Sequence, residues 1–256
     1  MTRSRKTHKI QRLLRGIALP LLVTVLWYFA THRRLGSGIL PSPKRTAAAL
    51  GELVSSGELS AHVKISLLRI GQGFMLAAGL AIPGGILVAS FPGFGDYVLP
   101  TLEFLRQIPP VAWIPVFILL LGIGELTKLA VIVYAAFFPI FVNTILGMTQ
   151  IDHQYWEVAR LLQFSRREIL GELILPAAAP SLIAGLRLGL SNSWRALVAA
   201  EMLAAFSGLG YMLMAARSLV RMEEMFIGIA TIGLLGLLFD WGWKALEKYL
   251  LVWRNR

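Results

Sequence analysis

Three polar side chains recur at four-residue intervals within a long apolar stretch of the chain. Arg187, Ser191 and Arg195 share one face of any helix that contains them, because residues i and i+4 lie one above the other. A charged group at the centre of a membrane-spanning helix costs about 2.5–3.5 kcal/mol on insertion scales, so such groups are treated first as functional. The stripe is suited to meeting a small anion, with Arg195 as the main candidate.

The role of Arg195 has two open interpretations. In the first, its guanidinium meets an anion near the middle of the membrane. In the second, it pairs with a carboxylate such as Glu201 or Glu103 and holds helices together. Glu201 itself lies nearer the outer end and is expected to be structural or part of a gate, while Arg106 and Gln107 precede a proline cluster and are expected to line the inner half of a path. The candidate translocation path therefore comprises Arg106, Gln107, Arg187, Ser191, Arg195 and Glu201.

The sequence lacks the residues that other kinds of site require. It contains no cysteine, which excludes disulfides and thiolate metal ligands. Its histidines lie far apart, at His8, His32, His62 and His153. No G-x-x-x-x-G-K-S/T phosphate loop, G-x-S-x-G elbow or H-E-x-x-H pair occurs. We therefore expect no metal site, no cofactor bound by this chain and no enzymatic activity.

The composition predicts a protein built into a membrane. Of 256 residues, 56% are hydrophobic and only 15% are charged, against about 25% charged in soluble domains. Apolar stretches near the roughly 20 residues needed to cross a bilayer occur about six times. We expect an all-α integral membrane protein of about six transmembrane helices, or five if the first is peripheral. The expected spans are 17–32, 66–90, 100–121, 127–148, 174–204 and 225–243.

The positive charge is concentrated where it orients a membrane protein. Six basic residues and no acidic one lie within residues 1–16, directly before an apolar run, as is typical of a cytoplasmic N-terminus. The alternative is a cleaved secretory signal, but no small-x-small cleavage site follows. The net charge of +11 is thus assigned to topology and not to nucleic acid. Six spans then return the C-terminus to the cytoplasm.

Prolines and glycines indicate that the spans pack as a bundle. Gly185 and Gly189 form a G-x-x-x-G pair, a spacing that lets two helices approach closely. Proline frees backbone carbonyls, which is tolerated only where neighbouring helices or a cavity satisfy them. The second, third and fifth expected spans contain Pro83, Pro109, Pro110, Pro115, Pro176 and Pro180.

The connection at 149–173 does not resemble a simple loop. Apolar and charged residues alternate from Trp156 to Glu168 in the pattern of a short amphipathic helix followed by a turn. A helix of this kind has three interpretations: it lies on the membrane, covers its own bundle, or docks into a partner's groove. Its nearly balanced charge argues against anionic lipid.

The same connection resembles the EAA motif of binding-protein-dependent ABC importer permeases. That motif reads E-A-A, three residues, G, nine residues and I-x-L-P, and Glu157, Ala159, Leu175 and Pro176 match it at the right spacing. Val158 and Leu173 are substitutions by similar residues. Gln163 replaces the glycine of the turn, which implies either a turn without positive φ or a different helix end.

The resemblance covers roughly residues 39–245. It includes Leu40–Pro43, Arg106–Pro115 with Gly122–Glu125, and Ala200–Glu201 with Gly208–Met212. Together these segments resemble the branch that carries aliphatic sulfonates, taurine, nitrate or bicarbonate, and that also serves some aromatic acids and thiamine precursors.

This resemblance implies a type I ABC importer permease that works as a homodimer in the bacterial plasma (inner) membrane. It implies two ABC ATPase subunits, which bind ATP and Mg²⁺, and an extracytoplasmic substrate-binding protein. The expected division is a basic N-terminus (1–16), a first span with an outer segment (17–65), a permease core (66–245) with a coupling helix at about 153–170, and a cytoplasmic tail (246–256). The expected ATPase-coupling residues are Glu157, Val158, Ala159, Arg160, Gln163, Arg166, Leu175 and Pro176, with Ala159 facing the ATPase groove.

Two other classes of protein fit the composition alone. A gradient-driven secondary transporter predicts ionisable pairs at mid-membrane and no docking helix. A non-transporting membrane scaffold does not require the polar stripe at 187–195. The motif at 157–176 favours the importer permease over both.

Overall fold

The computed structural model describes residues 22–31 and 40–251, and these form helices and turns without a strand. After a short apolar helix at Leu22–Thr31, the elements are α2 (Pro43–Ser55), α3 (Glu58–Ser90), α4 (Pro92–Arg106), the 3₁₀ turn η1 (Pro110–Trp113), α5 (Ile114–Leu121), α6 (Glu125–Thr149), α7 (His153–Leu161), α8 (Arg166–Glu168), the π-helical turn η2 (Ile169–Ile174), α9 (Leu175–Ala204), α10 (Leu209–Ser218) and α11 (Met222–Leu250). The all-α fold class is thus confirmed.

Four helices are long and apolar enough to cross a membrane: α3, α6, α9 with the end of η2, and α11. The helix α4 and the segment of η1 and α5 meet at a bend of 91°, and together they make a fifth span if the bent pair is counted as one. The expected first span, 17–32, lies partly outside the described residues, and its described part is a shorter apolar helix, Leu22–Thr31. The described part of the chain therefore holds four or five of the six expected spans.

The expected span at 100–121 is interrupted and is not one continuous helix. The helix α4 ends at Arg106, and the chain turns before η1 begins at Pro110. Pro109 and Pro110 carry no N–H to continue the hydrogen-bond ladder, and a residue before proline is disfavoured in the α conformation. This pair of prolines therefore breaks the span and leaves backbone carbonyls that other groups must satisfy.

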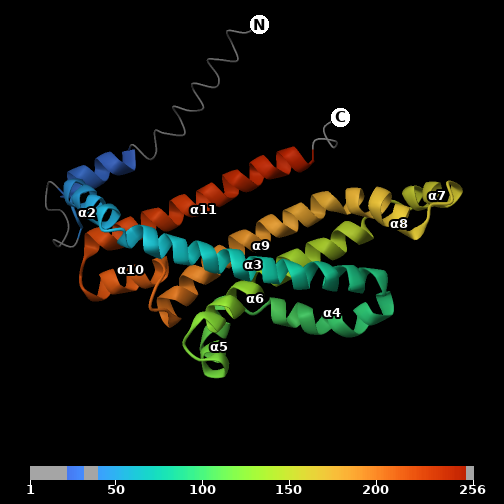
Figure 1. Ribbon diagram of the computed structural model, residues 1–256, viewed down its shortest axis with the longest axis horizontal. Coiled ribbons are helices and arrows are strands. Elements are labelled where there is room, and N and C mark those ends of the chain that lie inside the picture. Colours follow the sequence, from blue (N-terminus) through green and yellow to red (C-terminus); the bar gives the residue numbers. More distant parts are fainter. Residues whose placement is uncertain (1–21, 32–39, 252–256) are drawn as a thin grey trace, which may run out of the picture.

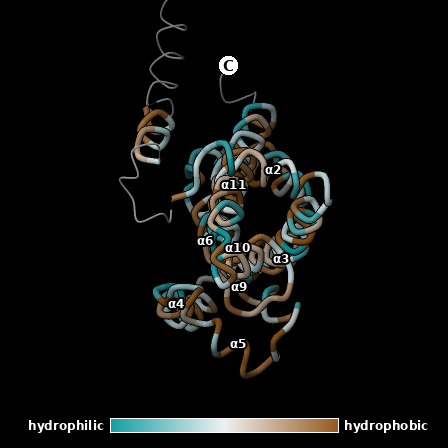
Figure 2. Tube along the Cα trace, turned by 90° about the vertical axis from the view of Figure 1, so that its left-hand side faces the viewer, coloured by the Kyte–Doolittle hydropathy of each residue, from teal (hydrophilic) through white to brown (hydrophobic). Residues whose placement is uncertain are grey.

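The long helices run between two ends of the molecule that carry different elements (Figure 1). The short helices α7 and α8 project at one end, where α6 finishes and α9 begins. At the opposite end lie α2 and α10. Viewed along the long axis, α4 lies beside the group formed by α3, α6, α9 and α10, and hydrophobic residues are distributed along every helix (Figure 2). A surface at α7 and a surface at α10 are therefore separated by the length of the bundle.

The helix α6 is packed between α3 and α9, and glycines make this packing close. A Cβ added at Gly185 would lie 2.5 Å from Cβ of Asn143, and one at Gly189 would lie 2.9 Å from Cγ1 of Ile140. Both distances are shorter than van der Waals contact allows, so larger residues do not fit. The G-x-x-x-G pair thus lies in the α6–α9 contact, as the sequence indicated.

One glycine pair in α3 gives a direct test of this packing. Gly73→Ala places a Cβ 2.5 Å from Cγ2 of Ile132, and overpacking of this kind costs about 1–3 kcal/mol. Gly71→Ala meets no atom within 4 Å and removes a glycine from a helix interior, which stabilises by about 0.5–1 kcal/mol. We expect the thermal unfolding midpoint of purified protein to fall for Gly73→Ala only. Equal midpoints for the two variants would contradict this packing.

Two of the expected division points fall inside helices. The point between residues 65 and 66 lies within α3, which begins at Glu58, and the point between 245 and 246 lies within α11. Residues 58–65 and 246–250 therefore continue the spanning helices. Residues 1–16 lie outside the described part of the chain.

Candidate functional site

The helix α7 is the amphipathic helix expected on the connection between two spans. Its N-cap is Asp152, whose Oδ1 accepts a hydrogen bond from the N–H of Gln154 (3.1 Å), a standard way to satisfy a free N–H of the first turn. Glu157 lies 3.3 Å from Nδ1 of His153, and both side chains are exposed. An exposed pair of this kind contributes little to stability, so Glu157 is free to meet a partner.

The end of α7 is a Schellman motif with a glutamine in the position that glycine usually occupies. Gln163 donates its N–H to the carbonyl of Arg160 (3.1 Å), and Phe164 donates to the carbonyl of Ala159 (3.0 Å), as this motif requires. The φ of Gln163 is +53°. A turn without positive φ is therefore the wrong alternative: the left-handed turn persists although its glycine is missing.

The presence of glutamine instead of glycine at position 163 predicts a measurable backbone strain. The left-handed conformation costs a residue with a Cβ roughly 1–2 kcal/mol. Gln163→Gly should therefore stabilise the end of α7 by about 1 kcal/mol, whereas Gln163→Ala, which keeps a Cβ, should not. Hydrogen–deuterium exchange of the α7 amides in purified permease should slow in the glycine variant alone. Unchanged exchange would show that the turn is not strained.

Ala159 does not face outward, and this corrects the expectation that it contacts the ATPase. It is 3% exposed within its own chain. In a Schellman motif the residue after the left-handed turn commonly contacts this position, and here that residue is the half-buried Phe164. The large apolar side chains that α7 and its cap expose instead are Tyr155 (60%), Val158 (51%), Leu161 (82%) and Leu162 (61%). We refer to these four residues as the α7 apolar surface.

A capping box starts the short helix that follows. The N–H of Ser165 donates to Oε2 of Glu168 (2.7 Å), and the N–H of Glu168 donates to Oγ of Ser165 (3.4 Å), which fixes the turn between α7 and α8. Arg160 is exposed in the last turn of α7, and the side chain of Arg166 lies outside the described residues. The coupling segment expected at 153–170 is thus two short helices joined by a tight turn.

The stability of the capping box should depend on pH through the carboxyl group of Glu168. Hydrogen bonds from the side chain and backbone of Ser165 hold the pKa of Glu168 below its ordinary value. A carboxylate with a lowered folded pKa stabilises above its unfolded pKa of about 4.3, and this contribution is lost as the pH falls through the lower folded value. As the pH falls through this window, hydrogen–deuterium exchange at the Ser165 amide should become faster than in the Glu168→Gln variant, whose side chain does not titrate. Parallel pH profiles would contradict the capping box.

The last two residues expected to take part in coupling begin α9. Leu175 is its first residue and is 52% exposed. Pro176 follows within the first turn of α9, where the π-helical η2 runs directly into the α-helix. The I-x-L-P part of the motif therefore lies near the start of the span Gly171–Ala204, shortly after α7 and α8.

Arg187 is engaged by acidic residues of α11. Its Nη2 lies 2.6 Å from Oδ1 of Asp240, and its Nη1 lies 3.6 Å from Oε2 of Glu247. Lys244 also pairs with Asp240. This cluster links α9 to α11, and Arg187 is engaged in ion pairs in this conformation. Ser191, one turn on, is half-buried.

Arg195 and Arg106 have no acidic partner among the described residues. Nη2 of Arg195 donates to Oδ1 of Asn192 (2.6 Å), so pairing of Arg195 with Glu201 or Glu103 is the wrong alternative. Arg106 is the last residue of α4, and Gln107 follows in the break. Arg106 and Asn192 line one cavity of about 310 Å³. The structure thus brings the end of α4, with Arg106, to the same cavity as the part of α9 that carries Asn192.

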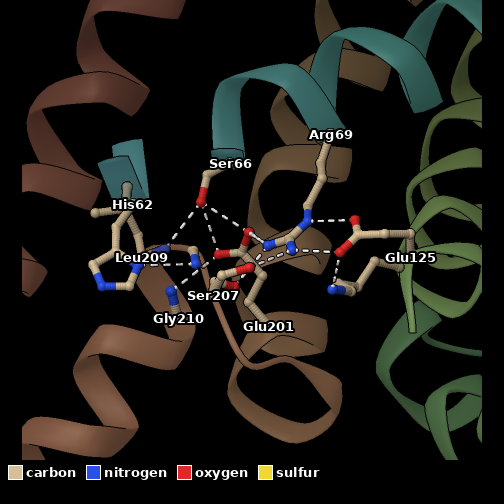
Figure 3. Close-up of polar contacts among 10 residues, drawn as sticks. His62, Ser66, Arg69, Glu125, Glu201, Ser207, Leu209 and Gly210 are labelled. Atoms are coloured by element: carbon tan, nitrogen blue, oxygen red, sulfur yellow. Dashed lines mark hydrogen bonds and ion pairs between the residues drawn. The ribbon is translucent and has the colours of Figure 1, made fainter. Parts of the chain in front are cut away.

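Glu201 lies in a buried polar cluster that connects α3, α6, α9 and α10 (Figure 3). Its side chain is 0% exposed. It accepts hydrogen bonds from Oγ of Ser66 (2.8 Å), Nη1 of Arg69 (2.8 Å) and the N–H of Gly210 (3.0 Å). Because these donors enclose the carboxylate, Glu201 holds helices together and does not line an open path in this conformation.

Arg69 is the centre of this cluster, and sequence reasoning did not identify it. Its guanidinium uses all of its five N–H donors: two to Glu125 (2.7 and 2.6 Å), one to Glu201 (2.8 Å), and two to the carbonyl and hydroxyl of Ser207 (2.7 and 2.8 Å). Lys128 lies 2.6 Å from Glu125. The two positive charges, on Arg69 and Lys128, balance the two negative charges of Glu125 and Glu201. The sequence did offer one signal for this residue, since Arg69 is an arginine inside the apolar span expected at 66–90.

The glycines near the end of α9 allow the chain to wrap around this carboxylate. Gly208 has a φ of +104°, and a Cβ there would lie 2.2 Å from Oε1 of Glu201. A Cβ at Gly210 would lie 2.4 Å from the carbonyl oxygen of Val198. The N–H of Gly208 donates to Nδ1 of His62 (3.1 Å). The G-L-G motif of the sequence therefore serves this cluster.

The chain matches the family described as "Binding-protein-dependent transport system inner membrane component" over residues 81–251. It is 38% identical to a putative aliphatic sulfonates transport permease protein of Bacillus subtilis (strain 168), over 94% of this chain and 88% of that protein. It is 32% identical to the taurine transport system permease protein of Escherichia coli (strain K12), over 93% and 88%. A chain of the inward-facing MetNI methionine ABC transporter has the same fold, with a TM-score of 0.64 at 18% identity, over 75% of this chain and 95% of that chain.

The chain belongs to this family of binding-protein-dependent transport proteins. It is the multi-pass membrane permease of an ABC importer and not an enzyme, and ATP hydrolysis belongs to a separate ATPase. The resemblance stated from the EAA motif and from the sulfonate and taurine branch is confirmed.

Proposed function

We propose that this permease carries a small oxyanion, such as an aliphatic sulfonate, taurine or nitrate, from an extracytoplasmic binding protein into the cytoplasm. The relatives named for aliphatic sulfonates and taurine support this substrate class. So do two cations, Arg106 at the cavity beside the α4 break and Arg195 bonded to Asn192 of the cavity lining, which have no carboxylate partner among the described residues. A permease for cations would be expected to place acidic groups there.

The observation that carries the mechanism is the α7 apolar surface at one end of the bundle. Four large apolar side chains exposed on so short a segment require a partner or a lipid surface. We assign them to a groove of an ABC ATPase subunit, with α7 and both chain termini on the cytoplasmic side. The homodimer then offers two such surfaces to two ATPase subunits. The end that carries α2 and α10 faces the binding protein.

In this assignment, ATP and Mg²⁺ are held by the ATPase subunits, and this chain binds neither. The described residues contain no group of three histidine or acidic side chains that could hold a metal ion. Closure of the ATPase dimer moves α7, and the rigid turn made by Gln163 and the capping box passes the movement to η2 and α9. The outer side of the pathway then opens, and hydrolysis restores the inward-open state.

The experiment is uptake by the reconstituted assembly. Proteoliposomes with the permease, its ATPase and its binding protein should accumulate radiolabelled taurine, methanesulfonate or nitrate only when ATP is enclosed. The permease alone should neither bind nor hydrolyse ATP. Accumulation that follows an ion gradient without ATP would favour a secondary transporter, and the absence of any uptake with a loaded binding protein would favour a scaffold.

A further inference from the structure

The cavity beside the α4 break has the composition of an anion site. Its volume of about 310 Å³ lies at the lower end of the range for small-molecule sites, about 300–1,000 Å³. Its polar lining residues are Arg106, Tyr134, Asn143 and Asn192, and none of the lining residues in the described part of the chain is acidic. Apolar side chains such as Phe138 and Leu188 form much of the remaining wall. A single charge in a mostly apolar wall gives a small anion a strong partner.

The backbone on either side of the cavity's cation, Arg106, is bound by a side chain of α6. Tyr134 of α6 donates its hydroxyl proton toward the carbonyls of Leu105 and Ile108, which stand on either side of Arg106 and Gln107. The carbonyl of Leu105 also accepts the N–H of Ile108 (3.0 Å), so Tyr134 adds a side-chain bond at the point where the span is interrupted. Tyr134 therefore fixes the end of α4 against α6, and the guanidinium of Arg106 is placed at the cavity without an ion pair to any described residue.

On the opposite wall a second cation, Arg195, acts through Asn192, which lines the cavity. The oxygen of Asn192 is occupied by Nη2 of Arg195 (2.6 Å), which leaves the amide N–H₂ of Asn192 as a donor for a ligand in the cavity. Asn143 differs, because its own N–H₂ donates to the carbonyl of Pro139 (2.8 Å) and its oxygen remains an acceptor. Glu103, one turn before Arg106, lines a neighbouring cavity together with Arg106 but forms no ion pair with it among the described contacts.

We propose that this cavity is a transport site for one small oxyanion, bound by the Arg106 guanidinium and the Asn192 amide, with Arg195 as a positioning residue. The proposal rests on the proposed function for the chemical class of the ligand, a sulfonate or nitrate group. Arginine matches such a group because its planar fork donates to two oxygens at once. The site lies between α4, α6 and α9, part-way along the bundle, where an anion needs a substitute for water.

The absence of cysteine from the sequence provides the test. A single cysteine at Leu188, which lines the cavity and is 52% exposed, can be labelled with a neutral maleimide in the purified permease–ATPase complex. Methanesulfonate, taurine and nitrate are the probes, at constant ionic strength in sodium chloride. At a probe concentration about ten times its dissociation constant, labelling should slow about tenfold, since only the unoccupied fraction reacts.

Two controls assign any protection to the site. A cysteine at Leu119, which is 85% exposed and does not line the cavity, should label at an unchanged rate. In the Leu188→Cys background, Arg106→Gln should abolish the protection, and the charge-matched Lys248→Gln on α11 should preserve it. Protection that survives Arg106→Gln, or labelling of Leu188→Cys that no probe slows, would overturn the proposal.

The two proposals can fail separately. If proteoliposomes import a probe with ATP while the cavity cysteine is never protected, the function stands and this site does not. If no probe is imported but Arg106-dependent protection is observed, the cavity is an anion site and the proposed transport function is wrong. Arg195→Ala separates positioning from contact, since it should weaken protection while Arg195→Lys restores part of it.

Discussion

Arg69→Ala is expected to lower the stability of the folded permease by about 3–5 kcal/mol, because it leaves a buried carboxylate without its cation. Arg69 is 3% exposed and Glu201 is fully buried. The other donors to Glu201, Ser66 and Gly210, are neutral and cannot balance its charge. Glu125 retains Lys128 at 2.6 Å and reaches the surface, so the loss arises mainly at Glu201.

The measurement is the thermal unfolding midpoint in detergent, compared at one heating rate because unfolding of membrane proteins is seldom reversible. Arg217→Ala, an exposed arginine at the end of α10, is the control and should leave the midpoint nearly unchanged. Arg69→Lys should be intermediate, because a lysine cannot reproduce five donors in a planar fork.

A double variant separates the ion pair from the loss of packing. If the charges couple, Arg69→Met combined with Glu201→Met should be less destabilised than the sum of the two single variants, since no buried charge remains. Strict additivity would show that Arg69 and Glu201 contribute independently. The cluster would then not be the link between α3 and α9 that its geometry indicates.

Two of the spans that the sequence predicts agree closely with helices of the structure. The expected 127–148 and 174–204 agree with α6 and α9 to within a few residues. The helix α3 begins at Glu58, eight residues before the expected span at 66–90. The hydropathy pattern missed its first two turns because Glu58, His62 and Lys64 make them polar. Hydropathy reports the part of a helix that lies in lipid, and helix caps report where it begins.

The third span shows what local patterns cannot supply. Pro109 and Pro110 were visible as helix breakers, but neither the 91° angle nor the contact of Tyr134, which binds carbonyls at the break from another helix, could be read from the local pattern. Arg69 was missed for the same reason. Its partners Glu125 and Glu201 lie 56 and 132 residues away in the sequence, and no periodicity connects them.

The motif predicted a short helix and a turn at this connection, and the structure has both, but Ala159 is oriented differently from the prediction. Ala159 was assigned to the partner's groove because a small residue at that position suggests a close contact. The Schellman turn at Gln163 explains why that contact is internal, since it returns the chain onto the C-terminal turn of α7. Spacing therefore identified the helix, and only the turn geometry identified the face that remains exposed.

Val158→Glu is expected to remove the ATPase from the purified complex while leaving the permease folded. Val158 is 51% exposed on the α7 apolar surface, three residues from Tyr155 and four from Leu162, so these side chains share one face of the helix. Docking would bury the new carboxylate without a cation, at about 3–5 kcal/mol, which is roughly a hundredfold or more in affinity. Copurification and uptake should both be lost.

Two further variants distinguish docking from folding. His153→Glu adds the same charge to the same helix at an exposed position next to Glu157, outside the α7 apolar surface, and should retain the ATPase. Ala159→Glu forces a charge into a position that is 3% exposed within the chain, so it should unfold the turn between α7 and α8 even in isolated permease.

Hydrogen exchange of the isolated permease identifies which loss has occurred. The α7 amides should exchange at the wild-type rate in Val158→Glu and faster in Ala159→Glu, because only the second change disrupts internal packing. Both variants should lose the ATPase, the first by blocking the surface and the second by destroying it. If Val158→Glu copurified with a full complement of ATPase and transported normally, the α7 apolar surface would not be the docking surface. If Ala159→Glu kept the wild-type exchange rate, its burial would not stabilise the turn, and the outward-facing interpretation of Ala159 would regain its support.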